Sequence, residues 1–259
     1  MSFYPVFHDA YDSLRFGRVL FVEIADGPPR NRPCRYCDLL ERMNRVPERT
    51  MFSAPAAAVS VILEETRRVA PVEGIVFGGR GDPLRHAGIG SILRRIRSSV
   101  HLATILLTDG VQLHDRAVRR EAGEAGSVVA YLPARRERRR RPEPSGRFDA
   151  WAQLVESIAA LRRETPVRVC LEIPVRPGET DDAENREAWR QAVGVIRPHR
   201  IFVIPDKGRS VGAGREPLPG TAEEELVESL ERVRRDIHPR AGVYLMDPTP
   251  VDDRCYCAR

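Results

Sequence analysis

The sequence alternates short apolar runs with amphipathic segments, and this alternation restricts the possible folds more than any other feature. The apolar runs have the length of buried strands and lie at 19–24, 74–77, 102–107, 127–132, 167–175, 200–204 and 242–246. Between them, apolar residues recur at helical spacing. Because parallel strands need helical crossovers, the pattern predicts seven parallel strands separated by six outer helices.

This arrangement predicts an α/β fold, with a partial TIM barrel as the natural closure and an open doubly wound sheet as the alternative. We expect an irregular lead-in at 1–18, one barrel domain at 19–246 and a tail at 247–259. In a nearly closed barrel the first and last strands are neighbours. The tail would then emerge beside the loop that follows the first strand.

The cysteines are the most informative reactive residues. Cys34 and Cys37 form a Cys-x-x-Cys pair directly after the first strand, and Cys255 and Cys257 lie in the tail after the last one. Two thiolates at this spacing can bind one metal ion or one cluster iron. If the four thiols converge, they can hold cluster iron or a structural zinc ion. The alternative is a frayed terminus in which the tail cysteines have no role.

Three other features receive plain structural interpretations. Ser53 is a candidate N-cap for a helix whose first turn holds Pro55. Cys170 lies in the middle of a strand and is expected to be a buried apolar residue. The six histidines show no metal-ligand spacing, so we expect them in loops or at the surface.

Charge and hydropathy limit the partners. No apolar run is long enough to span a bilayer, and the N-terminus lacks the order of a signal peptide, so we expect a cytoplasmic protein without membrane contact. The net charge is +5, and the segment 135–147, with seven arginines and two glutamates, equals that whole excess. Such a segment can contact an RNA or a phosphorylated small molecule, or can simply be solvated. Because Lys207 is the only lysine among 42 basic residues, a general arginine bias favours the solvated interpretation.

Several motifs, in order, resemble the radical S-adenosylmethionine (SAM) superfamily, in particular its molybdenum-cofactor and wyosine-type subgroup. Cys34-Arg35-Tyr36-Cys37 is similar to the second half of the cluster motif Cys-x-x-x-Cys-x-aromatic-Cys. Phe77 to Leu84 is similar to the Gly-x-Gly-Glu-Pro motif that binds the methionine amino group of SAM, and Leu107 to Gly110 is similar to a Thr-Asn-Gly turn. Weaker matches are Gly17-Arg18, Val129 to Ala134 and Arg141-Pro142.

The resemblance implies a radical SAM-like partial TIM barrel that holds a 4Fe-4S cluster and SAM. In such proteins three thiolates bind three irons, and the fourth iron chelates SAM. The resemblance implies Cys34 and Cys37 as metal ligands, and the expected place of the tail on the same face adds Cys255 or Cys257. The implied cofactor-binding residues are Gly78, Gly79, Gly81, Asp82, Pro83, Thr108 and Asp109. An electron donor such as flavodoxin or ferredoxin would then be a partner.

The chain departs from the family pattern at four positions. Arg30 stands where the family has its first cluster cysteine and cannot ligate iron. Asp82 replaces a glutamate, Asp109 replaces an asparagine, and Pro133 replaces an aspartate that is frequent in the subgroup. Three hypotheses follow: a radical SAM enzyme whose cluster is completed by a tail cysteine, a degenerate homologue that acts as a binding or scaffold protein, and a barrel with structural zinc. The substrate is unknown.

Overall fold

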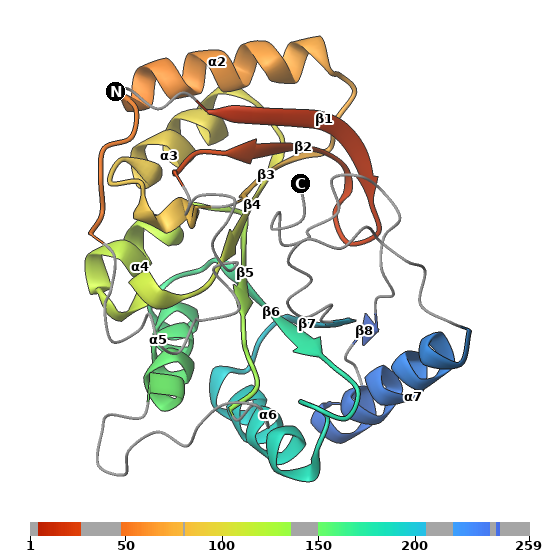
Figure 1. The fold of residues 1–259 in the computed structure, drawn as a ribbon. Coiled ribbons are helices and arrows are strands. Elements are labelled where there is room, and N and C mark those ends of the chain that lie inside the picture. Colours follow the sequence, from red (N-terminus) through yellow and green to blue (C-terminus); the bar gives the residue numbers. More distant parts are fainter. Residues whose placement is uncertain are drawn as a thin grey trace.

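The computed structural model describes residues 5–26, 48–79, 81–135, 150–205, 220–238 and 242–243. These residues form one eight-stranded sheet whose strands follow the order of the sequence (Figure 1). The first strand, β1, pairs antiparallel with β2, and each later strand pairs parallel with the one before it. The strands are β1 (Val6–Ser13), β2 (Gly17–Glu23), β3 (Gly74–Gly78), β4 (Ala103–Thr108), β5 (Ser127–Tyr131), β6 (Arg168–Val175), β7 (Arg200–Pro205) and β8 (Gly242–Val243).

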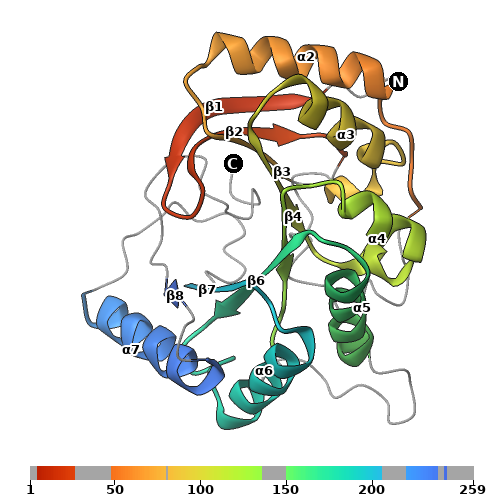
Figure 2. The same cartoon turned by 180° about the vertical axis from the view of Figure 1, so that it is seen from behind.

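Helices cover the convex side of this curled sheet, as the two opposite views show (Figures 1 and 2). They are α2 (Pro55–Arg68), α3 (Ile89–Ser99), α4 (Arg116–Ala122), α5 (Ala150–Glu164), α6 (Ala183–Ile196) and α7 (Gly220–Ile237), with 3-10 turns η1 (Pro83–Arg85) and η2 (Val111–His114). The predicted partial barrel of parallel strands with outer helices is confirmed. The doubly wound alternative is wrong, because the strand order never reverses and the helices lie on one side.

The prediction of an irregular lead-in is also wrong. Residues 6–13 form β1, which occupies the edge of β2 that the nearly closed barrel would have given to the last strand. In the part of the chain that the structure describes, β8 pairs only with β7. The lead-in was missed because its apolar residues are interrupted by His8, Asp9 and Asp12, which are tolerated at the edge of a sheet.

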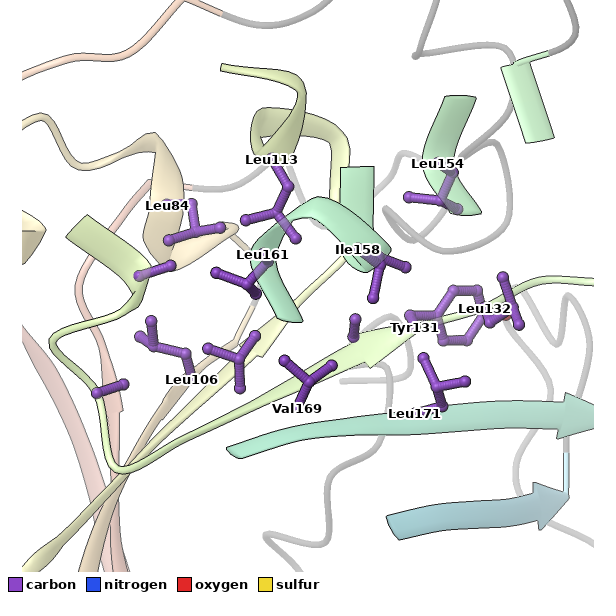
Figure 3. Packing of buried hydrophobic residues seen from close by; sticks show 14 of the residues in the cluster. Leu84, Leu106, Leu113, Tyr131, Leu132, Leu154, Ile158, Leu161, Val169 and Leu171 are labelled. Atoms are coloured by element: carbon purple, nitrogen blue, oxygen red, sulfur yellow. The ribbon is translucent and has the colours of Figure 1, made fainter. Parts of the chain in front are cut away.

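Side-chain alternation along the strands produces two apolar clusters. In β2, Leu20 and Val22 face the helices, whereas Val19 and Phe21 face the inside of the curl. The outer cluster is illustrated by Figure 3, where Leu154, Ile158 and Leu161 of α5 lie over β5 and β6. The inner cluster contains Cys170, which is 5% exposed, as predicted for a buried apolar residue. The inner face is therefore a second, smaller core that lines the half-barrel.

Candidate functional site

The predicted cofactor-binding residues lie together at the carboxyl ends of β3 and β4. Gly78 ends β3, Gly79, Gly81, Asp82 and Pro83 belong to the loop that follows, and Thr108 and Asp109 stand at the end of β4. The four predicted metal ligands, Cys34, Cys37, Cys255 and Cys257, lie outside the described residues, as do Arg30 and the segment 136–149. The structure therefore brings together the residues that were predicted to bind the cofactor.

Asp82 joins the two loops. Its side chain is buried, with the residue 3% exposed. Oδ1 accepts a hydrogen bond from the Leu84 amide at 2.8 Å, and Oδ2 accepts from Thr108 Oγ1 at 2.8 Å and from the Asp109 amide at 2.7 Å. These three donors come from two different strand ends, so the carboxylate fixes the distance between them. Because a carboxylate offers about four lone-pair positions, Asp82 is mainly committed to holding the chain itself.

The glycines of the β3 loop allow a close approach to the end of β2. A Cβ at Gly81 would lie 2.2 Å from the Ala25 carbonyl oxygen and 2.5 Å from that of Asp26. Gly79 has a φ of +100°, and a Cβ there would lie 2.2 Å from Cγ of Glu23. Only glycine fits at these two positions. The β3 loop is thereby pressed against the strand end from which the segment with Cys34 and Cys37 departs.

Replacing Gly81 by alanine is expected to separate these two strand ends. The new Cβ meets backbone oxygens, which cannot rotate away as a flexible side chain can. We expect the free energy of unfolding to fall by about 1–3 kcal/mol, the usual penalty of overpacking. Urea unfolding followed by circular dichroism measures this loss.

The matched control for Gly81→Ala is Gly194→Ala in α6. Apart from its chain neighbours and the backbone of its own helix, no atom lies within 4 Å of a Cβ built at Gly194. Alanine is the better helix former, so this variant should be more stable by up to about 1 kcal/mol. Equal stability of Gly81→Ala and the parent would contradict the close approach.

Sequence reasoning missed a second polar pair at the same end of the half-barrel. Glu23 is 4% exposed, and its Oε1 lies 3.0 Å from Nε2 of His8. The His8 ring packs edge-on against Phe21, with ring centroids 5.5 Å apart. In the sequence, Glu23 is the one acidic residue of the apolar run 19–24, which is a signal that could have marked it. Its partner lies on β1, which was not predicted. His8 was expected in a loop or at the surface, and it lies instead on the edge strand β1, where it is partly buried.

Among the described residues, no group of three or more His, Cys, Asp or Glu side chains is placed to hold a metal ion. Of the predicted basic segment, the structure describes Arg135, whose guanidinium carbon lies 5.7 Å from the centroid of the Trp151 ring. No helix in the described ranges is long and apolar enough to cross a membrane.

The curled parallel sheet, with its polar loops at the carboxyl ends of β3 and β4, has the fold of radical SAM proteins. A structure of TYW1 with a lysine-pyruvate adduct bound has a TM-score of 0.54 and 12% identity, over 85% of this chain and 74% of that one. A radical SAM methyltransferase from Sphaerobacter thermophilus has a TM-score of 0.59 and 16% identity, over 92% and 69%. At these identities the likeness concerns the fold.

In sequence, the chain is similar to the UPF0026 protein slr1464 of Synechocystis sp. The two are 25% identical over 205 residues, which cover 76% of this chain and 74% of that protein. No protein-family model matches the chain.

Proposed function

We propose that this protein binds a 4Fe-4S cluster and SAM and cleaves SAM reductively to start radical chemistry on a substrate that is not yet known. The observation that carries the proposal is the joined pair of loops at the carboxyl ends of β3 and β4, held by Asp82 on a radical SAM-like fold. The close approach of Gly79 and Gly81 to the end of β2 supports the proposal, because the chain leaves that strand toward Cys34 and Cys37.

In this proposal the thiolates of Cys34 and Cys37 bind two irons, and Cys255 or Cys257 takes the place of the cysteine that Arg30 replaces. The donor set fits, because the chain has four thiols besides the buried Cys170, and a cluster of this kind needs three. When bound, the reduced cluster supplies the electron that cleaves the sulfonium of SAM. An electron donor such as flavodoxin or ferredoxin would be the reductant.

The described residues have three tasks in the proposal. Gly79 and Gly81 let the β3 loop lie against the end of β2, which would bring the backbone proposed to hold the methionine part of SAM next to the strand end that leads to Cys34 and Cys37. Asp82 holds this loop at a fixed position relative to Thr108 and Asp109, and the acceptor position that remains on the Asp82 carboxylate would favour an ammonium group. The apolar inner face, which includes Phe21 and Phe202, limits access of water to the reacting atoms.

Anaerobic reconstitution with iron and sulfide tests the proposal. Iron and sulfide are counted per chain, and EPR spectra of the reduced protein are recorded with and without SAM. We expect a 4Fe-4S signal that SAM changes, and we expect Cys34→Ala to lose it. Cys255→Ala/Cys257→Ala should lose it as well, if a tail cysteine is the third ligand. The matched control is Cys170→Ala, which removes a thiol from the inner core and should keep the signal.

Two other outcomes would replace the proposal with one of its alternatives. A colourless protein with stoichiometric zinc, lost in the same cysteine variants, indicates a structural zinc site. A protein that takes up neither cluster nor zinc and does not bind SAM indicates a degenerate homologue with a binding or scaffold role. Contact of the segment 135–147 with an RNA or a phosphorylated small molecule is a separate prediction, which binding assays at several salt concentrations test.

A further inference from the structure

Both ends of the segment 27–47 rest on the same short loop. At its entry, the carbonyl oxygens of Ala25 and Asp26 lie against Gly81, and Arg85 Nη1 donates to the Asp26 oxygen at 2.9 Å. At its exit, the Thr50 amide donates to the Arg85 carbonyl oxygen at 2.9 Å, and the Ala87 amide donates back to the Thr50 oxygen at 2.9 Å. The loop that follows β3 therefore fixes where the segment begins and where it ends.

Arg49 is the centre of the exit contact. Its Nε donates to the Leu84 carbonyl oxygen at 2.8 Å, and Nη2 donates to the His86 carbonyl oxygen at 3.0 Å. The same guanidinium forms a two-pronged pair with Glu121 of α4, at 3.2 Å from Nη1 to Oε1 and 2.6 Å from Nη2 to Oε2. A planar guanidinium can make these contacts at once, whereas a lysine ammonium cannot span them.

His86 reinforces the contact from within the loop. It lies in a loop, one of the two positions expected for the histidines, but it is fully buried and not at the surface. Its Nδ1 accepts from the Gly88 amide at 2.9 Å, so the proton of the neutral ring belongs on Nε2, which lies 3.1 Å from Ser53 Oγ. Burial lowers the pKa of His86, and the Arg49 charge acts in the same direction, so the ring stays neutral.

The contact also explains why Ser53 is not the predicted cap. Ala54 is the N-cap of α2 and makes no side-chain capping bond, while Ser53 turns to His86. The side chain that local sequence assigned to a helix start is thus used to fasten the residues after the segment 27–47.

From these contacts we infer that Arg49, with Glu121 and His86, is a positioning residue that sets the place of the Cys34-Cys37 segment relative to the β3 loop. The inference rests on the proposed function, because it assumes that the cysteines and the β3 loop serve one site. Arg49 donates to the carbonyl oxygens of the residues before and after Arg85. Both oxygens lie within three residues of Pro83, at the end of the predicted cofactor-binding loop. A shift at this point would change where the chain that leads back from Cys37 meets the loop proposed to hold SAM.

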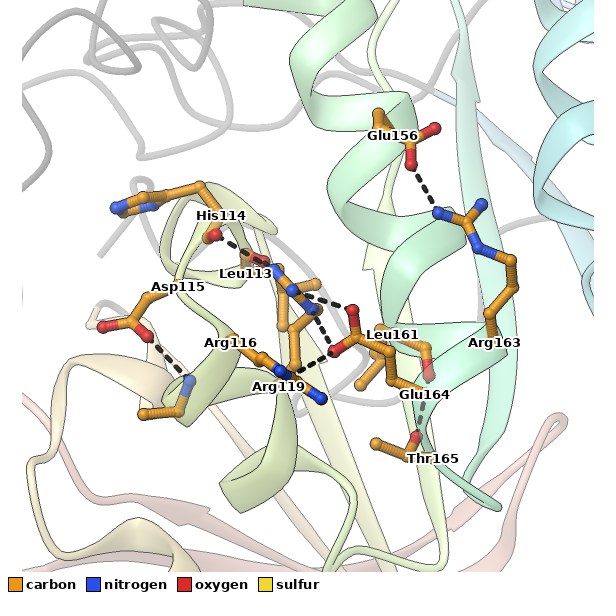
Figure 4. Close-up of polar contacts among 11 residues, drawn as sticks. Leu113, His114, Asp115, Arg116, Arg119, Glu156, Leu161, Arg163, Glu164 and Thr165 are labelled. Carbon is orange, nitrogen blue, oxygen red and sulfur yellow. Dashed lines mark hydrogen bonds and ion pairs between the residues drawn. The ribbon is translucent and has the colours of Figure 1, made fainter.

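A second arginine provides the matched control. Arg119 donates from Nη1 to the carbonyl oxygens of Leu113 and His114 at 2.8 and 2.9 Å, and forms a two-pronged pair with Glu164 (Figure 4). Arg119 thus makes the same type of fork as Arg49, a carboxylate and two carbonyl oxygens of a loop. It fastens η2, however, and none of these contacts involves residues 48–53.

The test compares the reconstituted full chain with Arg49→Lys, Glu121→Gln and the control Arg119→Lys. It measures the Kd of SAM, the EPR change on adding SAM, and the melting temperature of each form. We expect Arg49→Lys to bind SAM about 10-fold to 100-fold more weakly than the parent, as loss of a supporting contact does at metal sites. Glu121→Gln, which keeps the arginine, should show the same direction with less loss of stability.

Arg119→Lys should lose as much melting temperature as Arg49→Lys and keep the SAM affinity of the parent. Parent-like affinity in both Arg49→Lys and Glu121→Gln would overturn the inference. If the parent itself takes up no cluster, the proposed function fails. Limited trypsin digestion then tests separately whether Arg49 holds the end of the segment 27–47. Faster cleavage after Arg42 and Arg45 in Arg49→Lys than in Arg119→Lys would support this role of Arg49, and equal rates would overturn it.

Discussion

Replacing Arg15 by alanine should lower the free energy of unfolding by about 3–5 kcal/mol, because it leaves the buried Glu172 carboxylate without its charge partner. Arg15 Nη1 lies 2.5 Å from Glu172 Oε2, and the two side chains are 6% and 9% exposed. The guanidinium carbon lies 5.1 Å from the Phe16 ring centroid and 5.4 Å from that of Phe202. The pair therefore sits in the apolar inner face of the half-barrel. Urea unfolding followed by circular dichroism measures the loss.

Two further variants separate the ion pair from simple loss of a side chain. Arg15→Met/Glu172→Leu removes both charges and should recover most of the stability, because neither partner is left buried alone. Arg163→Ala removes one partner of an exposed pair, also at 2.5 Å, whose side chains are 59% and 61% exposed. This control should change stability by less than about 1 kcal/mol. A double variant as unstable as Arg15→Ala would argue against the electrostatic explanation.

Asp82→Ala should be nearly as harmful, with an expected loss of about 3–4 kcal/mol. The substitution leaves the Leu84 amide, the Thr108 hydroxyl and the Asp109 amide without the acceptor they share. Each unsatisfied buried donor costs about 1–3 kcal/mol, and the losses are less than additive because the donors are neighbours. In the reconstituted protein the same variant should also bind SAM more weakly, since the β3 and β4 loops are no longer joined.

Asp115→Ala is the control for Asp82→Ala. Asp115 Oδ1 accepts from the Ala117 amide at 2.7 Å as the N-cap of α4, so its role is also to satisfy backbone donors. This bond is exposed, and water can replace it, so we expect a loss of about 1 kcal/mol. Similar losses in the two variants would mean that the Asp82 network contributes no more than an ordinary helix cap. Asp82→Asn, which keeps one oxygen, should fall between the two.

The candidate site was predicted in part. The glycines, Asp82 and Asp109 were predicted from their resemblance to radical SAM motifs, and the structure places them together because the carboxyl ends of parallel strands meet at one edge. Their roles were not fully visible. Asp82 was expected to face the methionine amino group, whereas its oxygens mainly accept bonds from the chain itself. The predicted cluster ligands lie outside the described residues and stay predictions.

The sequence by itself determined the order of strands and helices, because apolar periodicity is a local property that each segment carries alone. Only the tertiary structure decided the place of β1, the burial of His86, and the partners of Arg15 and Arg49. Glu172 lies 157 residues after Arg15 and Glu121 lies 72 residues after Arg49, so no local pattern relates them. Such pairs are fixed only when the sheet curls and places distant strand ends, loops and helices side by side.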